Sequence, residues 1–240
     1  VLTGFITSAD QVTRIVVELC ETGVKEYSIH SDTDHIVVDP GEKIRSEKLL
    51  ILSGTDAYAL LEQFAEIWGA EMHARTWDHL PNGWCSWYYY FDRVTENDIL
   101  ENAAWLKSRQ GEYPLEYIQL DDGYQAALGD WLACNEKFPH GLEFLAKEIK
   151  KNGFKPGIWL APFLVEKRSK LFAAHPEWMV RNRDGEIAFP MKWRTGKAAI
   201  LDGTHPEVQQ FLTALFRRLG AMGWAYAKLD FLVFECGVHD

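Results

Sequence analysis

Residues 117–123, Tyr-Ile-Gln-Leu-Asp-Asp-Gly, form a short apolar run that leads directly into two carboxylates and a glycine. Three similar runs, which we predict to be strands, lie at residues 83–89, 157–160 and 225–229. The segments between them carry apolar residues three and four positions apart, as helices do. Strands that alternate with helices over short connections form parallel βαβ units, so this part of the chain is predicted to be α/β.

The helices between these strands have recognisable boundaries. Thr95 is expected to cap the first helix, with Asp98 in the capping-box position. Gly153 is predicted to end the second helix. Pro206 is typical of the first turn of the third helix, and Gly220 is predicted to end it.

Four parallel strands over residues 76–240 fit two architectures. One is a doubly wound sheet, and the other is half of a (β/α)8 barrel, which typically needs ~250 residues. No glycine-rich phosphate loop follows any of the strands, which argues against a nucleotide-binding fold. The residues themselves leave both architectures open.

Residues 1–75 show a different pattern. β-branched runs at 14–19 and 35–38 and an apolar run at 48–52 are typical of short antiparallel strands. A helix is predicted to follow, capped by Asp56 and ended by Gly69. We therefore expect two domains, 1–75 and 76–240.

The composition restricts the classes of partner. The chain has 25 Lys and Arg against 35 Asp and Glu, a net charge of −10, so nucleic acid and anionic membrane surfaces are not expected partners. No apolar stretch approaches the ~20 residues that span a bilayer. Four cysteines without a C-x-x-C motif favour a reducing, cytoplasmic compartment over a disulfide scaffold.

The chemically distinctive residues follow or end the predicted strands, where parallel α/β folds place their active sites. In chain order, they are Trp87, Asp121, Asp122, Trp159, Lys228 and Asp230. Carboxylates accept hydrogen bonds from sugar hydroxyls, and indole faces cover the apolar side of a hexose ring. These residues together predict a carbohydrate site.

Each of these residues also has a simpler structural explanation. The Asp-Asp-Gly sequence fits a turn, and both tryptophans fit a hydrophobic core. Lys228 and Asp230 lie two positions apart on an apolar strand that we expect to be buried, so they face the same side. A buried Lys–Asp pair adds little stability but can hold an aspartate ionised, so a functional role is favoured here.

Metal and thiol chemistry have weaker support. The eight histidines are scattered, without H-x-H or H-E-x-x-H motifs. A carboxylate-only Mg²⁺ or Ca²⁺ site at Asp121, Asp122 and Asp230 is conceivable, but Lys228 would add a fixed positive charge to it. The cysteines have no obvious adjacent base that would make one of them a nucleophile.

Five motifs occur in one order: GWCSW at 83–87, LDDGY at 120–124, KPGIWLAPF at 155–163, HPEW at 175–178 and KLDF at 228–231. Over about residues 80–235 the chain thus resembles the melibiase-like α-galactosidases of glycoside hydrolase family 36. The resemblance implies that residues 76–240 are the first four βα units of a (β/α)8 TIM-type barrel. It also implies that residues 1–75 are the end of a β-sandwich domain plus a linker helix.

The same resemblance implies an activity, the hydrolysis of terminal α-galactosides by a retaining mechanism without cofactor or metal. The substrate is then an α-galactoside or a galactose-containing oligosaccharide. The implied catalytic nucleophile is Asp230, and the implied substrate-binding residues are Asp121, Asp122, Lys228, Trp159 and Trp87.

Two departures from the family pattern leave alternatives open. The third motif reads Trp-Leu-Ala-Pro-Phe, where many members have a Glu beside the proline, and the family's general acid is expected to lie beyond Asp240. We therefore expect a fragment that is inactive alone. A raffinose-synthase-like transglycosylase, a non-catalytic sugar-binding relative and a homo-oligomer of the full-length enzyme stay open.

Overall fold

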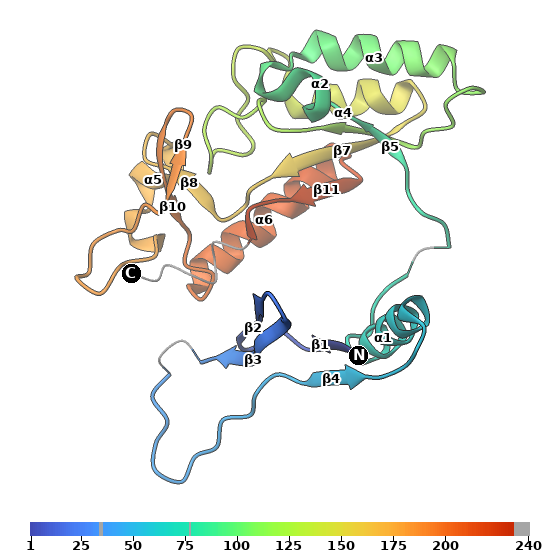
Figure 1. Ribbon diagram of the computed structural model, residues 1–240. Helices are drawn as coiled ribbons and strands as arrows, with labels where there is room; N and C mark the ends of the chain where they lie inside the picture. Colours follow the sequence, from blue (N-terminus) through green and yellow to red (C-terminus); the bar gives the residue numbers. More distant parts are fainter. Residues whose placement is uncertain (34–35, 77, 233–240) are drawn as a thin grey trace. The chain divides into compact units, whose positions relative to one another are not determined.

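The computed structural model of the protein describes residues 1–33, 36–76 and 78–232 (Figure 1). Its contacts divide the chain into two compact units, Val1–His79 and Leu80–Asp240. In the described part of the chain, no helix is both long enough and apolar enough to cross a membrane. The second unit holds all six predicted site residues.

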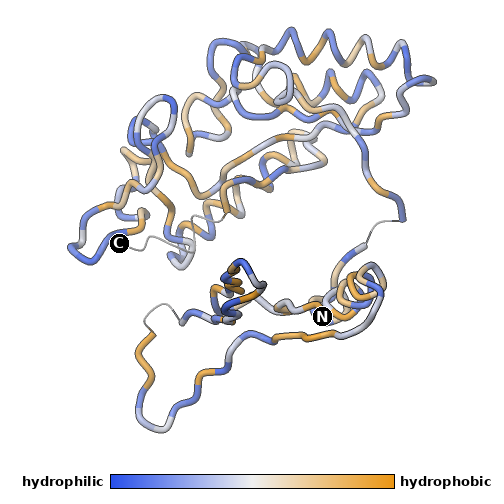
Figure 2. The backbone as a smooth tube through the Cα atoms, viewed as in Figure 1, coloured by the Kyte–Doolittle hydropathy of each residue, from blue (hydrophilic) through white to orange (hydrophobic). Residues whose placement is uncertain are grey.

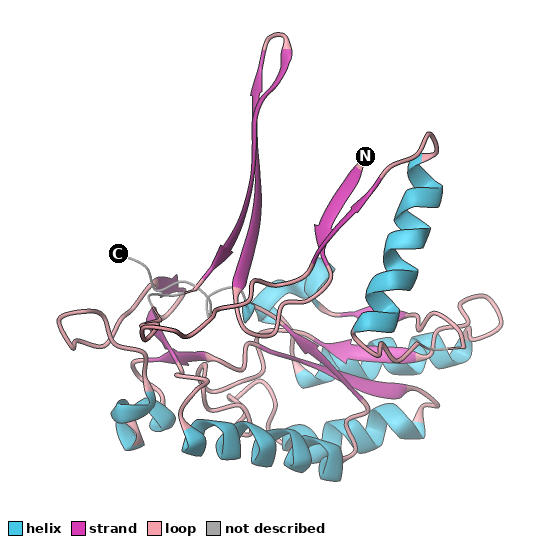
Figure 3. Cartoon of the chain, turned by 90° about the horizontal axis from the view of Figure 1, so that it is seen from below, coloured by secondary structure: helices cyan, strands magenta, loops and turns pink. Residues whose placement is uncertain are grey.

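A four-stranded parallel sheet forms the centre of the second unit, and the α/β prediction is confirmed. Its strands are β5 (Gly83–Cys85), β6 (Tyr117–Leu120), β7 (Lys155–Leu160) and β11 (Tyr226–Leu229). The main connecting helices are α3 (Glu96–Ser108), α4 (Gly141–Lys151) and α6 (Pro206–Met222). Figure 3 shows a row of helices along one face of the parallel strands.

The strand order of this sheet is β11-β7-β6-β5. Each new strand along the chain is thus added at the same edge, without the reversal of direction that defines a doubly wound sheet. The described strands form an open sheet and not a closed barrel.

The core lies between the two inner strands and the helices. Ile118 and Ile158 are fully buried in β6 and β7, and Leu145 and Ile149 are fully buried on α4. Figure 2 shows hydrophobic residues along β7. A strand that is covered on both faces becomes continuously apolar, which is the pattern of residues 156–160.

The predicted helix caps hold at the start of α3. The Thr95 side chain accepts a hydrogen bond from the Asp98 backbone N–H, and the Asp98 carboxylate accepts one from the Thr95 N–H. The predicted end of α6 at Gly220 is wrong, because the helix continues to Met222. It ends at Gly223, whose φ of +102° is the left-handed conformation that glycine adopts without strain.

The predicted strand over residues 83–89 is also partly wrong. Strand β5 ends at Cys85, and α2 (Trp87–Tyr90) and the 3-10 turn η1 (Phe91–Arg93) follow. The Tyr90 N–H bonds the Ser86 carbonyl at 3.0 Å, which closes a helical turn directly after the strand. Aromatic side chains favour strands, which is why the run at 87–90 resembles one in sequence, but this run lacks the polar alternation of a half-buried strand.

The expectation that the last strand is buried is wrong. Tyr226 and Leu229 are exposed, because β11 is the edge strand and pairs only with β7 within the described residues. Lys228, which points to the site, is the partly buried residue of this strand.

A segment without predicted elements connects β7 to α6. It contains β8 (Leu164–Glu166), α5 (Lys170–Ala174), the 3-10 turn η2 (Pro176–Trp178), β9 (Met191–Trp193) and β10 (Gly196–Ile200). The three strands form a separate antiparallel sheet in the order β8-β10-β9. We refer to residues 161–205 as the excursion.

The first unit contains two antiparallel strand pairs and one helix. They are β1 (Leu2–Phe5) with β4 (Leu49–Leu52), β2 (Val12–Cys20) with β3 (Gly23–Asp32), and α1 (Ala57–Glu71). Asp56 caps α1 as predicted, by accepting hydrogen bonds from two backbone N–H groups. The strand predicted at 35–38 is wrong for residues 36–38, and residue 35 lies outside the described residues. The partner of β2 is instead the more polar β3.

Candidate functional site

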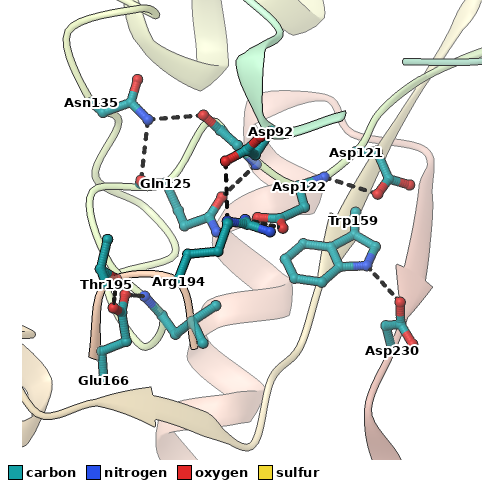
Figure 4. A network of polar contacts seen from close by, with 12 residues as sticks. Asp92, Asp121, Asp122, Gln125, Asn135, Trp159, Glu166, Arg194, Thr195 and Asp230 are labelled. Atoms are coloured by element: carbon teal, nitrogen blue, oxygen red, sulfur yellow. Dashed lines mark hydrogen bonds and ion pairs between the residues drawn. The ribbon is translucent and has the colours of Figure 1, made fainter. Parts of the chain in front are cut away.

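The carboxyl ends of β6, β7 and β11 bring four of the six predicted residues together. Lys228 lies directly opposite Trp159 in the parallel register of β11 and β7. The Lys228 Nζ is 3.0 Å from Asp121 Oδ2, across from β11 to the end of β6. The Trp159 Nε1 donates to Asp230 Oδ2 at 2.9 Å (Figure 4).

The Asp121 carboxylate is held by a full set of donors. Its Oδ2 accepts hydrogen bonds from Lys228, from Gln119 Nε2 at 2.6 Å and from the Cys85 thiol at 3.4 Å. Its Oδ1 accepts the Asp122 N–H at 2.9 Å. Only 2% of Asp121 is exposed, so these contacts replace its water and orient it.

Burial and the nearby Asp121 shift the pKa values of Lys228 and Cys85. Burial alone lowers the pKa of Lys228, but the hydrogen bond and the charge of Asp121 outweigh it, and Cys85 and Asp230 add to them. The pKa of Lys228 is therefore raised. Burial, together with the nearby Asp121 charge, raises the pKa of Cys85 to about 11. At neutral pH, Lys228 is a cation and Cys85 is an uncharged thiol.

Asp122 turns to different partners from those of Asp121. Its Oδ2 accepts a hydrogen bond from Arg194 Nη2, and its Oδ1 accepts one from Gln125 Nε2 at 2.7 Å. Arg194 also bonds Asp92 through Nε, at 3.1 Å. One guanidinium thus joins the carboxylates that follow α2 and β6 (Figure 4).

Arg194 was missed by the sequence analysis. It lies in the turn between β9 and β10, within the excursion for which no element was predicted. One signal was present: two adjacent carboxylates expected in a sheltered site need more than the single lysine to balance their charge.

Gly123 explains why the acidic pair is followed by glycine. Its φ is +118°, and a Cβ at this position would meet the Asp92 carbonyl oxygen at 2.5 Å. The close backbone approach places Asp92 where Arg194 can reach both it and Asp122. The Asp-Asp-Gly segment is therefore a turn and also part of the polar cluster.

Trp159 contacts this cluster through its indole nitrogen. The ring is buried, with Trp131 at 5.8 Å and Phe231 at 6.4 Å between ring centroids, both edge-on. Its observed role is to hold the Asp230 carboxylate, and the Phe231 N–H holds the second oxygen of that carboxylate at 2.8 Å.

Trp87 reaches the cluster through its backbone, which hydrogen-bonds the sulfur of Cys85. It is the first residue of α2, and its ring packs edge-on against Phe91 at 5.3 Å. Among residues 78–232, the Trp87 ring makes no hydrogen bond to the other five predicted residues or to Arg194.

Two further features bear on what the site can hold. Within the described residues, no three His, Cys, Asp or Glu side chains are arranged to hold a metal ion. A mainly apolar hollow of about 820 Å³ lies between the 129–133 loop, α5 and α6, but no predicted site residue lines it. The polar contacts, and not this hollow, locate the candidate site.

Comparisons with known proteins agree with this geometry. The family model described as Melibiase matches residues 67–233. The α-galactosidase AgaA of Geobacillus stearothermophilus is 26% identical over 188 residues, which cover 73% of this chain and 25% of that protein. The chain therefore spans about a quarter of the length of this curated relative.

Solved structures show the same relationship. TtGalA, an α-galactosidase from Thermus thermophilus in complex with p-nitrophenyl α-D-galactopyranoside, has a TM-score of 0.61 and 34% identity. The match covers 72% of this chain and 36% of that one. A variant of the Geobacillus stearothermophilus AgaA, in complex with 1-deoxygalactonojirimycin, has a TM-score of 0.71 at 21% identity. It covers 95% of this chain and 32% of its own, and shows similarity of fold alone.

Proposed function

The chain belongs to the Melibiase family, and on that basis we propose that it is the nucleophile-bearing part of a retaining α-galactosidase. The observation that carries the proposal is the polar cluster at the carboxyl ends of the parallel strands. There, an oriented carboxylate, Asp230, lies beside an ion pair of Lys228 and Asp121. The Geobacillus stearothermophilus AgaA and the Thermus thermophilus TtGalA are both α-galactosidases, which supports the same substrate class.

Asp230 is the proposed nucleophile. Each of its oxygens accepts one protein hydrogen bond, from Trp159 Nε1 and from the Phe231 N–H, so the carboxylate is held in one orientation. In a retaining mechanism, this carboxylate attacks the anomeric carbon while the bond to the leaving oxygen breaks, and water later releases the sugar. We propose that the acid that protonates the leaving oxygen lies outside residues 1–240.

Lys228 and the acidic pair are the proposed contacts to the sugar hydroxyls. The ammonium has three donors, of which Asp121 takes one, and a third of the Lys228 side chain is exposed. A carboxylate can accept about four hydrogen bonds, and Asp122 accepts two from protein donors, so it retains acceptor positions for a sugar hydroxyl. Asp121 already accepts four, so its proposed contact to the sugar needs one of these donors to be exchanged. Trp87 and Trp159 are the proposed walls of the pocket.

The architecture proposed for the complete domain is a (β/α)8 barrel. Four strands in chain order, each added at the same edge, are the topology of the first half of such a barrel. The antiparallel strand pairs of residues 1–75, followed by α1, support the proposal that this unit is the end of a β-sandwich domain plus a linker helix.

The test of this function is chemical rescue of Asp230→Gly in the full-length protein. We expect hydrolysis of p-nitrophenyl α-galactoside to be lost and then restored by azide. The azide nitrogen attacks the anomeric carbon as p-nitrophenolate leaves, which yields the β-galactosyl azide. Asp184→Ala, an exposed aspartate outside the cluster, is the control and should retain activity.

Two results would contradict the assignment. Turnover by Asp230→Gly within tenfold of the parent would mean that another group is the nucleophile. Rescue that gives the α-azide would mean that the missing carboxylate does not form the covalent intermediate. Adding sucrose to the parent assay separates hydrolysis from galactosyl transfer, because transfer yields a galactosylated sucrose.

A further inference from the structure

Glu166 is a buried carboxylate that the proposed mechanism does not use. It is the last residue of β8, in the excursion, and only 2% of it is exposed. Its Oε2 accepts the Leu128 N–H at 2.9 Å, and Arg168 donates to both oxygens at 3.1 and 3.2 Å. The Thr195 hydroxyl donates to Oε1 (Figure 4).

These contacts join three segments that are distant in sequence. Leu128 follows the acidic pair in the loop after β6, Glu166 ends β8, and Thr195 lies in the turn between β9 and β10. The backbone supports the first connection, because the Glu166 N–H donates to the Leu128 carbonyl at 3.1 Å. Glu166 therefore links the loop that carries the acidic pair to the turn of the excursion.

The turn that Glu166 holds is the one that carries Arg194. Arg194 immediately precedes Thr195 and reaches back to Asp122 and Asp92. The contacts thus close a ring that runs from Asp122 through Arg194, Thr195 and Glu166 to Leu128 and back along the loop.

The turn needs such an anchor. It joins a strand of three residues to one of five, and Arg194 and Thr195 are both exposed. A long side chain on an exposed turn loses conformational entropy when it is held in one geometry. The anchor is ionised, because the donors from Thr195, Leu128 and Arg168 outweigh burial and lower the pKa of Glu166.

We infer that Glu166 is a positioning residue of the site: through Thr195 it fixes the turn from which Arg194 orients Asp122 toward the sugar. This role rests on the proposed function. The contacts of Glu166 are all to protein groups, and the hydrogen bonds to Asp230 come from Trp159 and Phe231 and not from this turn, so we expect the main effect on substrate binding.

The test is Glu166→Gln in the full-length protein, compared with Glu96→Gln. The control is another buried carboxylate of the same unit, held by His140 through its Nδ1 at 2.6 Å, on α3 and away from the cluster. With p-nitrophenyl α-galactoside, we expect Glu166→Gln to raise KM about five- to thirtyfold with kcat within threefold, as for a weakened charge-assisted hydrogen bond. Glu96→Gln should leave KM unchanged.

Two further measurements separate the inference from the proposed function. Glu166→Gln should increase hydrogen exchange of the 191–200 segment, which can be observed even if the protein has no galactosidase activity. In combination with Arg194→Ala, it should add less than twofold to the rise in KM, because both changes act on the same contact. Unchanged exchange, or additive effects on KM, would overturn the positioning role.

Discussion

The ion pair between Lys228 and Asp121 allows a quantitative test of the site geometry through stability alone. We expect Lys228→Met to reduce the free energy of unfolding by about 1–3 kcal/mol at pH 8. Breaking a buried pair costs about 3–5 kcal/mol because one charge stays without a partner. The value expected here is lower, since 33% of the Lys228 side chain is exposed and water can replace part of the interaction.

The matched control is Lys155→Met. Lys155 and Glu116 are also 3.0 Å apart, and they lie at the amino ends of β7 and β6, opposite the carboxyl ends that carry the cluster. Their side chains are 53% and 27% exposed, against 33% and 2% for Lys228 and Asp121. Loss of this exposed pair should cost less than about 1 kcal/mol.

Urea unfolding followed by tryptophan fluorescence measures both losses. Asp121→Asn, alone and combined with Lys228→Met, then gives the coupling energy, which should exceed about 1 kcal/mol. Because the pKa of Lys228 lies above its ordinary 10.5, the stabilisation is complete below that pH and is lost as pH rises through the raised value. Equal losses for the two lysines, or a difference that does not shrink above pH 11, would refute the reasoning.

Two further predictions concern the same sheet edge and the thiols. Trp159→Phe removes the Nε1 hydrogen bond to Asp230 but keeps an aromatic ring. We therefore expect kcat for p-nitrophenyl α-galactoside to fall roughly ten- to hundredfold, with little change in KM. An unchanged kcat would show that this hydrogen bond has no catalytic effect. In the native chain, iodoacetamide at pH 8 should modify Cys20 before Cys85 and Cys134. Cys20 is exposed, and its hydrogen bonds to Thr22 lower its pKa. Burial raises the pKa values of Cys85 and Cys134 to about 11. Peptide mass spectrometry gives the order, and early labelling of Cys85 would contradict its packing against Asp121.

Strands β6, β7 and β11 could be predicted from sequence because each follows or precedes one of the strongly amphipathic helices α4 and α6. The Thr95 cap and the β6 strand agree closely with the structure. The excursion could not be predicted in this way, since its strands have only three to five residues and show neither alternation nor helical spacing. Burial of β11 was predicted wrongly because an apolar composition does not reveal that a strand lies at an edge.

The part of the candidate site that lies at the strand ends could be predicted from sequence, and the part that lies in the excursion could not. Side chains at the ends of neighbouring parallel strands must meet, which brought Asp121, Lys228 and Asp230 together without any knowledge of the loops. Arg194 and Glu166 depend on how the excursion folds back over the sheet, and no local pattern indicates such a tertiary contact.

Asp121 and Asp122 divide their partners between the sheet and the excursion. The two carboxylates directly follow β6, and their hydrogen bonds show that they reach different cations. Asp121 faces the sheet and pairs with Lys228 from β11, while Asp122 faces the excursion and pairs with Arg194. Of the acidic pair, Asp122 is therefore the one on which changes in the excursion should act directly. The ion pair of Lys228 and Asp121 is built on the sheet, whereas Asp230 is linked to the excursion indirectly, because the Trp193 ring packs edge-on against Phe231 at 5.5 Å.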